Sequence, residues 1–155
     1  ALFKYAEFKQ MGNFYQATFD HEANFKYSDF YAEADFRKVE FQRLAYFKYT
    51  KFKDDASFEN ARFQDYADFK YTKPASYINF SNAVFEDDAT FKYVTFEDGS
   101  SFRDASFNQD VDFKYTKFYK PLDFKGVAFN DNTDFKYTTY EGMDFTEYLL
   151  NKVNE

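Results

Sequence analysis

The carboxylates and the single histidine are the side chains best suited to catalysis in this sequence. Asp54-Asp55 and Asp87-Asp88 are adjacent carboxylate pairs of the kind that can act as general acid and base, and His21 is the only histidine. Nothing in the sequence buries these groups or supplies a charged partner, so solvated turns are the better interpretation. The chain also lacks cysteine, a phosphate-binding loop, a nucleophile motif and the Gly-Gly-x-Gly-x-Asp calcium repeat. We therefore predict a protein that is not an enzyme and holds neither a metal nor a cofactor.

A second chemical pattern is better suited to binding. The tripeptide Phe-Lys-Tyr begins at positions 3, 25, 47, 69, 91, 113 and 135, which is a constant 22-residue period. If one such period returns the chain to the same place, lysines and tyrosines form two adjacent ladders. The central members of these ladders are Lys26, Tyr27, Lys48, Tyr49, Lys70, Tyr71, Lys92, Tyr93, Lys114 and Tyr115.

Such ladders have two interpretations. Interleaved cations and aromatic rings could bind an anionic or single-stranded polymer by charge and stacking. Alternatively, tyrosine ladders stabilise a sheet by cross-strand stacking, with lysines as flanking solubilising groups. We favour the structural interpretation, because outward aromatic residues are common in β-structure.

Phenylalanine defines the elements that must position these ladders. Phe occurs at 3, 8, 14, 19, 25 and onward, with spacings that alternate between five and six residues, and 24 of the 26 lattice positions up to residue 140 are Phe. The exceptions are Pro74 and Tyr140, and Phe145 lies off the lattice. Steps of five or six residues turn an α-helix by about 140° or 240°, which scatters the rings over opposite sides. A step of five also alternates the faces of a flat strand. The chain must instead turn a corner at each repeat.

The residues before each Phe support a narrow packed interior. Two positions earlier the residue is Ala in twelve of the 26 cases and is never charged. The residue between is often a turn former, as in Ala23-Asn24-Phe25 and Ala67-Asp68-Phe69. This pattern resembles the pentapeptide-repeat family in its Phe-rich variant, over residues 1 to about 145.

The resemblance implies an all-β fold, a right-handed quadrilateral β-helix. The 22-residue period gives about seven coils, which should stack at about 4.8 Å into a rod roughly 30–35 Å long. The family's usual coil has four equal pentapeptides. Here every second repeat carries a sixth residue, which should bulge two of the four corners.

We expect a β-helix over residues 1–145 and a capping helix and tail over 146–155. Asp144 and Glu147 form a capping box that would start a short helix from Phe145 to about Val153. Its Leu149, Leu150 and Val153 could cover the last layer of Phe rings.

The N-terminal coil shows no comparable cap. Its first rings and backbone groups would face water, and such an edge invites pairing with another chain. We predict a twofold homodimer with a contact that contains Leu2, Phe3, Phe8 and Phe14. A chain cut from a longer solenoid is the alternative.

Charge is segregated by side of the predicted rod. The five-residue side that starts at Phe-Lys-Tyr carries ten Lys against Glu7 and Asp29, although the whole chain has a formal charge of −7. The six-residue side that starts at residue 19 carries eleven acidic residues and only Arg43 as a cation. Some pentapeptide-repeat proteins imitate duplex DNA and bind bacterial topoisomerases. The acidic side could therefore make this chain an inhibitor or protector of gyrase.

That alternative has two weaknesses. B-DNA presents a charge about every 1.7 Å along its axis, which is denser than one side of this rod. No long loop interrupts the lattice, whereas quinolone-resistance members of the family project loops. We predict a non-enzymatic structural or binding rod, whose partner is an unidentified protein or an anionic polymer.

Composition adds expectations about location. No apolar run approaches the ~20 residues of a membrane helix, and no secretory leader opens the sequence. With the absence of cysteine, this leads us to expect a bacterial protein of the cytoplasm.

Pro74 is the one mid-rod exception to the Phe lattice. The missing ring should leave a void beside Phe52 and Phe96, one coil away on either side. The unusually large Tyr77 and Ile78 are the candidates to fill it.

Overall fold

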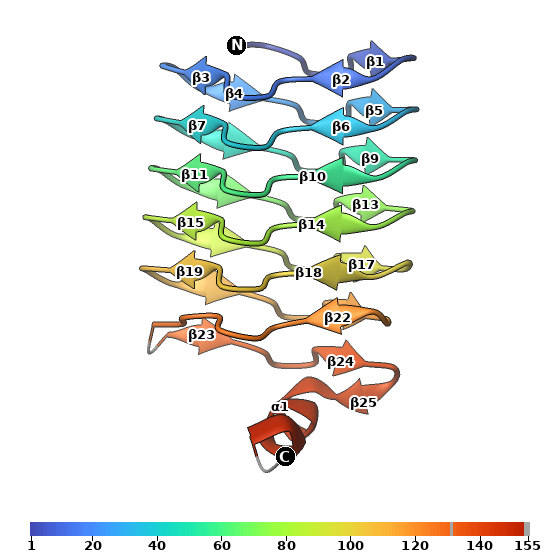
Figure 1. Cartoon of the computed structure of the whole chain (residues 1–155), viewed down its shortest axis with the longest axis vertical. Coiled ribbons are helices and arrows are strands. Elements are labelled where there is room, and N and C mark those ends of the chain that lie inside the picture. The colour runs from blue at the N-terminus through green and yellow to red at the C-terminus, as the bar shows by residue number, and fades with distance from the viewer. Residues whose placement is uncertain (131, 154–155) are drawn as a thin grey trace.

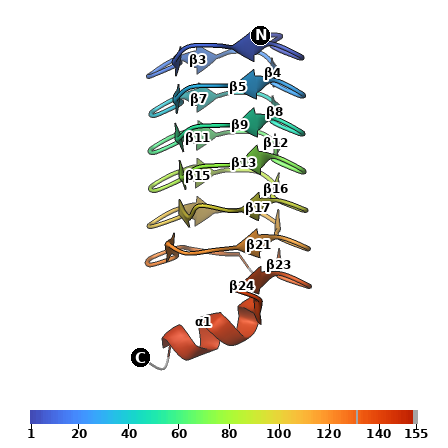
Figure 2. The ribbon, with the colours of Figure 1, turned by 90° about the vertical axis from the view of Figure 1, so that its right-hand side faces the viewer.

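The chain forms a right-handed, four-sided β-helix, as the sequence predicts. The computed structural model describes residues 1–130 and 132–153, with side chains described up to residue 151. Six complete coils and half of a seventh stack into a rod, with the N-terminus at one end and a single helix at the other (Figures 1 and 2).

Each strand is very short, a single residue pair, and lies parallel to its counterparts in the coils before and after it. One side holds β1 (Glu7–Phe8), β5 (Asp29–Phe30), β9 (Lys51–Phe52) and β13 (Lys73–Pro74). After a break, the same side continues with β17 (Thr95–Phe96), β21 (Lys117–Phe118), β24 (Thr139–Tyr140) and β25 (Met143–Asp144). Strand β25 pairs antiparallel with β24. The second sheet holds β2 (Gly12–Asn13), β6 (Ala34–Asp35), β10 (Ala56–Ser57), β14 (Ile78–Asn79), β18 (Ser100–Ser101) and β22 (Leu122–Asp123). The third holds β3 (Thr18–Phe19), β7 (Glu40–Phe41), β11 (Arg62–Phe63), β15 (Val84–Phe85) and β19 (Ser106–Phe107). The fourth holds β4 (Ala23–Asn24), β8 (Ala45–Tyr46), β12 (Ala67–Asp68), β16 (Ala89–Thr90), β20 (Val111–Asp112) and β23 (Thr133–Asp134).

Four columns of phenylalanine fill the rod. Within a column, rings of successive coils lie nearly parallel, with centroids from 4.4 Å apart for Phe8 and Phe30 to 5.6 Å for Phe107 and Phe129. Most rings of different columns meet edge to face, as Phe25 and Phe36 do at 5.3 Å and 87°. Both arrangements are ones that aromatic pairs prefer. The predicted phenylalanine ladder is confirmed.

The five-residue repeats close through hydrogen-bonded turns. In the first, the Ala6 amide donates to the Phe3 carbonyl at 3.0 Å, and Tyr5 between them has a φ of 63°. The side chain before the Phe often braces the same turn, as when Asn24 Oδ1 accepts from the Lys26 amide at 3.0 Å. This bond explains why Asn, Asp, Ser or Thr often precedes the Phe that starts a five-residue repeat.

The six-residue repeats form bends that project from the rod. The bends between β1 and β2 and between β3 and β4, and their counterparts in later coils, lie at opposite edges in Figure 1. Carboxylates tie successive bends together: Asp55 Oδ1 accepts from the Tyr77 amide at 3.1 Å, and Asp88 Oδ1 accepts from the Asp110 amide at 3.1 Å. The extra residue therefore bulges two corners.

Pro74 interrupts one sheet between β13 and β17. Elsewhere a Phe amide donates to a carbonyl of the next coil, as Phe25 does to Tyr46 at 2.7 Å. Proline has no N–H for this bond. Within the described chain, no backbone hydrogen bond joins these two strands, although the sheet resumes where β17 pairs with β21.

The two residues expected to fill the missing ring's place behave differently. Ile78 is buried in the core, on a column otherwise occupied by residues such as Ala56 and Ser100. Tyr77 lies in a surface groove with Asp55 and is only half-buried. Tyr77 therefore does not fill the core, because its backbone belongs to a projecting bend.

Helix α1 (Phe145–Val153) covers the last coil (Figure 2). Asp144 Oδ1 accepts from the Glu147 amide at 3.2 Å, which confirms Asp144 as the N-cap. Phe145 is fully buried and its ring lies 4.9 Å from that of Phe135, while the Tyr148 ring lies 4.2 Å from that of Tyr140.

The prediction of which helix residues cover the last coil is therefore partly wrong. Leu149 packs against the core, but Leu150 is 59% exposed, and the side chain of Val153 lies outside the described residues. The cap at Asp144 sets the phase of the helix. It directs Phe145, Tyr148 and Leu149, at positions i, i+3 and i+4, toward the coil.

Candidate functional site

The seven tyrosines of the Phe-Lys-Tyr tripeptides form one continuous stack along the rod. Neighbouring ring centroids lie 4.8–5.2 Å apart, and the rings are nearly parallel. The sequence correctly aligns these residues but assigns them to strands. The structure instead has each one at the left-handed position of a turn, with φ between 58° and 63°.

Left-handed backbone is costly for residues other than glycine, at about 1–2 kcal/mol. At the corresponding turns on the opposite side, this position is occupied by polar residues or glycine, such as Asn60, Asn82 and Gly126. Asparagine and glycine tolerate this conformation best. On the tyrosine side, ring stacking offsets part of the strain, since an aromatic pair contributes about 0.5–1.5 kcal/mol.

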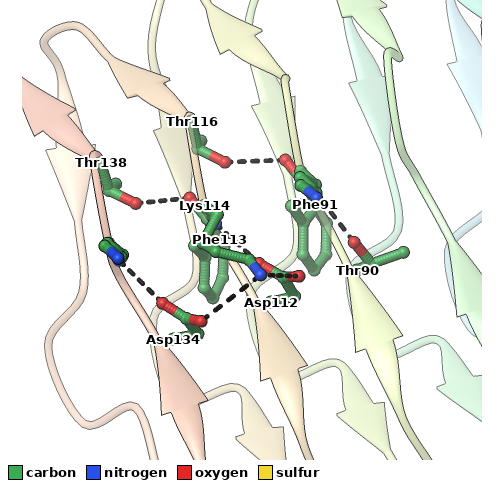
Figure 3. Close-up of polar contacts among 10 residues, drawn as sticks. Thr90, Phe91, Asp112, Phe113, Lys114, Thr116, Asp134 and Thr138 are labelled. Atoms are coloured by element: carbon green, nitrogen blue, oxygen red, sulfur yellow. Dashed lines mark hydrogen bonds and ion pairs between the residues drawn. The ribbon is translucent and has the colours of Figure 1, made fainter.

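A ladder of buried hydroxyls anchors the same turns from inside. Thr116 Oγ1 donates to the Phe91 carbonyl at 2.7 Å, and Thr138 Oγ1 donates to the Phe113 carbonyl (Figure 3). Thr50 and Thr72 make the equivalent bonds in earlier coils. The ladder is absent from the sequence-based candidates, although the 22-residue spacing of these small polar residues could have revealed it.

The lysines of the tripeptides do not form one row. Every second lysine lies beside the tyrosine that follows it, with the ammonium 5.1–5.5 Å from the ring centroid; these are Lys4, Lys48, Lys92 and Lys136. Two of the intervening lysines turn toward the neighbouring sheet. Lys26 lies 4.2 Å from the Tyr46 ring, and Lys114 lies 3.6 Å from Asp112 and 3.7 Å from Asp134 (Figure 3). Lys70 and Lys92 both line a groove that also contains Asp88.

Repulsion explains this alternation. Two ammonium groups one coil apart would repel by about 0.8 kcal/mol even in water. Turning alternate lysines aside doubles their separation, and carboxylates or a ring face are available on the other side.

A second set of lysines flanks the tyrosine stack on its other side. Lys51, Lys73 and Lys117 belong to β9, β13 and β21 and are exposed. In the sequence they count toward the charge of the basic side but are not among the candidate binding residues. We call the tyrosine stack, its adjacent lysines and these three residues the Tyr-Lys face.

The acidic side forms a shallow groove of about 420 Å³, lined by residues that include Tyr66, Asp88, Asp110, Asp112 and Asp134. Burial, and to a smaller degree the carboxylate of Asp68, raises the pKa of the Tyr66 hydroxyl above its ordinary value. Several of the carboxylates accept backbone hydrogen bonds; Asp88, for example, braces the next bend.

The carboxylate pairs and the histidine, which the sequence assigns to solvated turns, lie on projecting bends. Asp54 and Asp87 each accept a hydrogen bond from the amide of the following aspartate, at 2.8 Å in both cases, and His21 is exposed. Among the described residues, no group of three or more His, Cys, Asp or Glu side chains could hold a metal ion.

The first coil leaves apolar surface uncovered. Leu2 is 76% exposed, whereas Phe3, Phe8 and Phe14 are half-buried. In the next coil, the equivalent rings of Phe25 and Phe30 are fully buried.

Comparison with known proteins identifies the family. The model for pentapeptide repeats matches residues 25–73 and 76–117, more than half of the sequence, with nine copies. The chain therefore belongs to the pentapeptide-repeat family, and the boundary between the two matches coincides with the sheet break at Pro74.

Other comparisons add little. A solved structure of trypsin-treated QnrB1, a plasmid-mediated fluoroquinolone resistance protein, aligns over 96% of this chain and 95% of its own, with 12% identity and a TM-score of 0.22. A TM-score this low supports no inference from that protein to this chain. The curated proteins contain no match. In the part of the chain that the structure describes, no helix is long and apolar enough to cross a membrane.

Proposed function

We propose that this protein is a non-enzymatic binding rod whose Tyr-Lys face contacts an anionic polymer. The observation that carries the proposal is the continuous tyrosine stack with lysines on both sides. A purely structural ladder needs the stacking but not two flanking sets of cations.

The charge of the face supports the proposal. The side carries ten Lys against two acidic residues, in a chain whose formal charge is −7. The two acidic residues, Glu7 and Asp29, both lie in the first two coils. The strongly basic part of the face therefore extends from the third coil to the sixth. A local concentration of positive charge of this kind attracts polyanions despite a negative net charge.

Fluorescence anisotropy with a labelled oligothymidylate tests the proposal. We expect binding that weakens as salt is added, because each neutralised phosphate releases counterions. The triple variant Lys51→Gln, Lys73→Gln and Lys117→Gln should weaken binding by about tenfold or more at low salt.

The control variant removes the same charge elsewhere. Lys38, Lys120 and Lys125 are exposed and lie outside the Tyr-Lys face. Changing all three to Gln should alter affinity much less. Equal losses in the two triple variants, or no binding by the unchanged protein, would contradict the proposed face.

The alternative function is imitation of DNA by the acidic side, with gyrase as the partner. The acidic groove favours it, but Lys114, 3.6 Å from Asp112 and 3.7 Å from Asp134, offsets part of the charge that a partner would meet. Adding the purified protein to a gyrase supercoiling reaction tests this alternative. Inhibition or protection by the unchanged protein, lost when Asp110 and Asp134 are both changed to Asn, would support it.

We further propose that two copies associate through the first coil, with Leu2, Phe3, Phe8 and Phe14 in the contact. Their exposure supports this, since stacking a second coil on them would remove the rings from water. Analytical ultracentrifugation of the chain at micromolar concentration should give a dimer that Leu2→Lys with Phe8→Lys dissociates. A monomer under these conditions would rule the contact out.

A further inference from the structure

We propose that the Tyr-Lys face recognises its polymer by charge and hydrogen bonds without base stacking, and that the ligand it fits best is a linear inorganic polyphosphate. This inference rests on the proposed function and makes it more specific. It replaces base stacking, which the sequence pattern suggested, with contacts from ring edges, hydroxyls and alternate lysines.

The faces of the tyrosine rings are already occupied. Each internal ring, such as Tyr71, stacks on both neighbours, with centroids 4.8 Å from those of Tyr49 and Tyr93. A base inserted between two rings would need them about 7 Å apart or more, since each aromatic contact requires roughly 3.5 Å. Only Tyr5 and Tyr137, at the ends of the stack, each have a face not covered by another tyrosine of the stack.

The rings cannot separate to admit a base, because the backbone holds their spacing. The Tyr49 amide donates to the Lys70 carbonyl at 3.1 Å, and the Tyr71 amide donates to the Lys92 carbonyl at 3.1 Å. Opening the stack would break these bonds between coils and part the phenylalanine columns beneath them. Base-stacking recognition needs accessible ring faces, and this face offers them only at its ends.

What the stack presents to a ligand is electropositive. Aromatic rings are positive at their edges and negative on their faces. In a stack viewed from the side, the edges point outward. Among the described residues, the hydroxyls of Tyr49, Tyr71, Tyr93 and Tyr115 have no hydrogen-bond partner, so each can donate to an anionic oxygen.

The available charges follow the alternation of the lysines. Lys48 and Lys92 lie beside the stack, whereas Lys26 and Lys114 are directed at Tyr46 and at carboxylates. Lys51, Lys73 and Lys117 supply cations along the other side of the stack. This arrangement suits a flexible chain with closely spaced charges. Because bases and sugars gain no contact here, an unsubstituted chain, whose phosphate charges are closer together than those of a phosphodiester chain, should bind best.

Competition anisotropy with three probes tests this inference. The probes are inorganic polyphosphate, an oligothymidylate, and an abasic phosphodiester oligomer with the same number of phosphates. We expect the oligothymidylate and the abasic oligomer to bind within about twofold of each other, and polyphosphate to bind more tightly.

The outcomes separate this inference from the proposed function. An oligothymidylate that binds about tenfold more tightly than the abasic oligomer would show stacking and overturn recognition without base stacking, while leaving the binding face intact. A failure of polyphosphate to compete better than the abasic oligomer would overturn the assigned ligand. If none of the probes bound, the proposed function itself would fail.

A matched pair of variants tests the alternation. The first variant combines Lys48→Gln with Lys92→Gln, and the second combines Lys26→Gln with Lys114→Gln. Both variants remove the same charge from the same position of the repeat. At near-physiological salt, where screening acts within about 8 Å, the first pair should weaken polyphosphate binding about fivefold or more and the second pair by less than about twofold. Equal losses would overturn the assignment of alternate lysines to the ligand.

Discussion

The buried hydroxyl ladder provides the sharpest test of how the tyrosine turns are held. Thr116 is fully buried, and its Oγ1 donates to the Phe91 carbonyl at 2.7 Å. In the coil before, the ladder position is Val94, which is 1% exposed and has no hydroxyl to donate to the Phe69 carbonyl. The chain thus contains both versions of the same site, and exchanging them should move stability in opposite directions.

The expected size follows from the partners that remain. In Thr116→Val the Phe91 carbonyl keeps its turn bond from the Val94 amide at 3.2 Å, so it is not left without a partner. The loss should therefore be that of one net hydrogen bond, about 1 kcal/mol, and not the larger penalty of an unsatisfied buried group. Val94→Thr should stabilise by about 0.5–1 kcal/mol, since the Phe69 carbonyl has only its turn bond from Thr72 at 3.1 Å.

Urea unfolding followed by circular dichroism measures both changes in unfolding free energy. In thermal unfolding, a change of about 1 kcal/mol should shift the melting temperature by about 2–4 °C in a domain of this size. Thr139→Val is the control, because it makes the same chemical change at a half-buried residue of β24 and should stay within about 0.5 kcal/mol.

Opposite results would refute the ladder. If Thr116→Val were neutral while Val94→Thr destabilised the rod by more than about 1 kcal/mol, the hydroxyls would be tolerated and not stabilising. The two changes act on different carbonyls, so the double variant should be close to their sum.

Individual repeats supply three further predictions. Pro74→Phe should be neutral or stabilising, because it restores an N–H for the Thr95 carbonyl and a ring for the column. If denaturant unfolding showed a loss of more than about 1 kcal/mol of unfolding free energy, the coil would have rearranged around the proline. Asp35→Asn keeps the turn acceptor but loses the charge pair with Arg37, 2.8 Å away, which lowers the pKa of Asp35 from 3.8. The stability difference from the unchanged protein should therefore be present above about pH 4 and disappear as the pH falls through the lowered pKa, measured by unfolding at several pH values; a pH-independent difference would contradict it. Asn82→Val places a β-branched residue at a φ of 59° and should lower the unfolding free energy by at least about 1 kcal/mol. An unchanged unfolding free energy would contradict backbone strain at this turn.

Much of the architecture was predictable because a solenoid repeats one local rule. The Phe spacing excludes helices and flat strands, and the small residues before each ring and the 22-residue period complete the definition of the coil. The N-cap at Asp144 was equally predictable from the sequence, since an N-cap depends on residues only three positions apart. Both features are local in sequence, and sequence patterns report local constraints well.

Side-chain direction could not be predicted in the same way. All seven lysines of the tripeptides occupy identical positions in the repeat, yet Lys92 lies beside the tyrosine stack while Lys114 pairs with carboxylates of two coils. The difference arises because neighbouring like charges repel and different partners lie within reach in each coil. Only the stacked coils bring those partners together.

The tyrosines illustrate the same division. By itself the sequence determined that Tyr49, Tyr71 and Tyr93 align along one side of the rod. The tertiary structure decided that their rings stack face to face, because adjacent coils hold them 4.8 Å apart. That spacing closes the ring faces and leaves the edges outward, which changes the chemistry that the side can offer to a ligand.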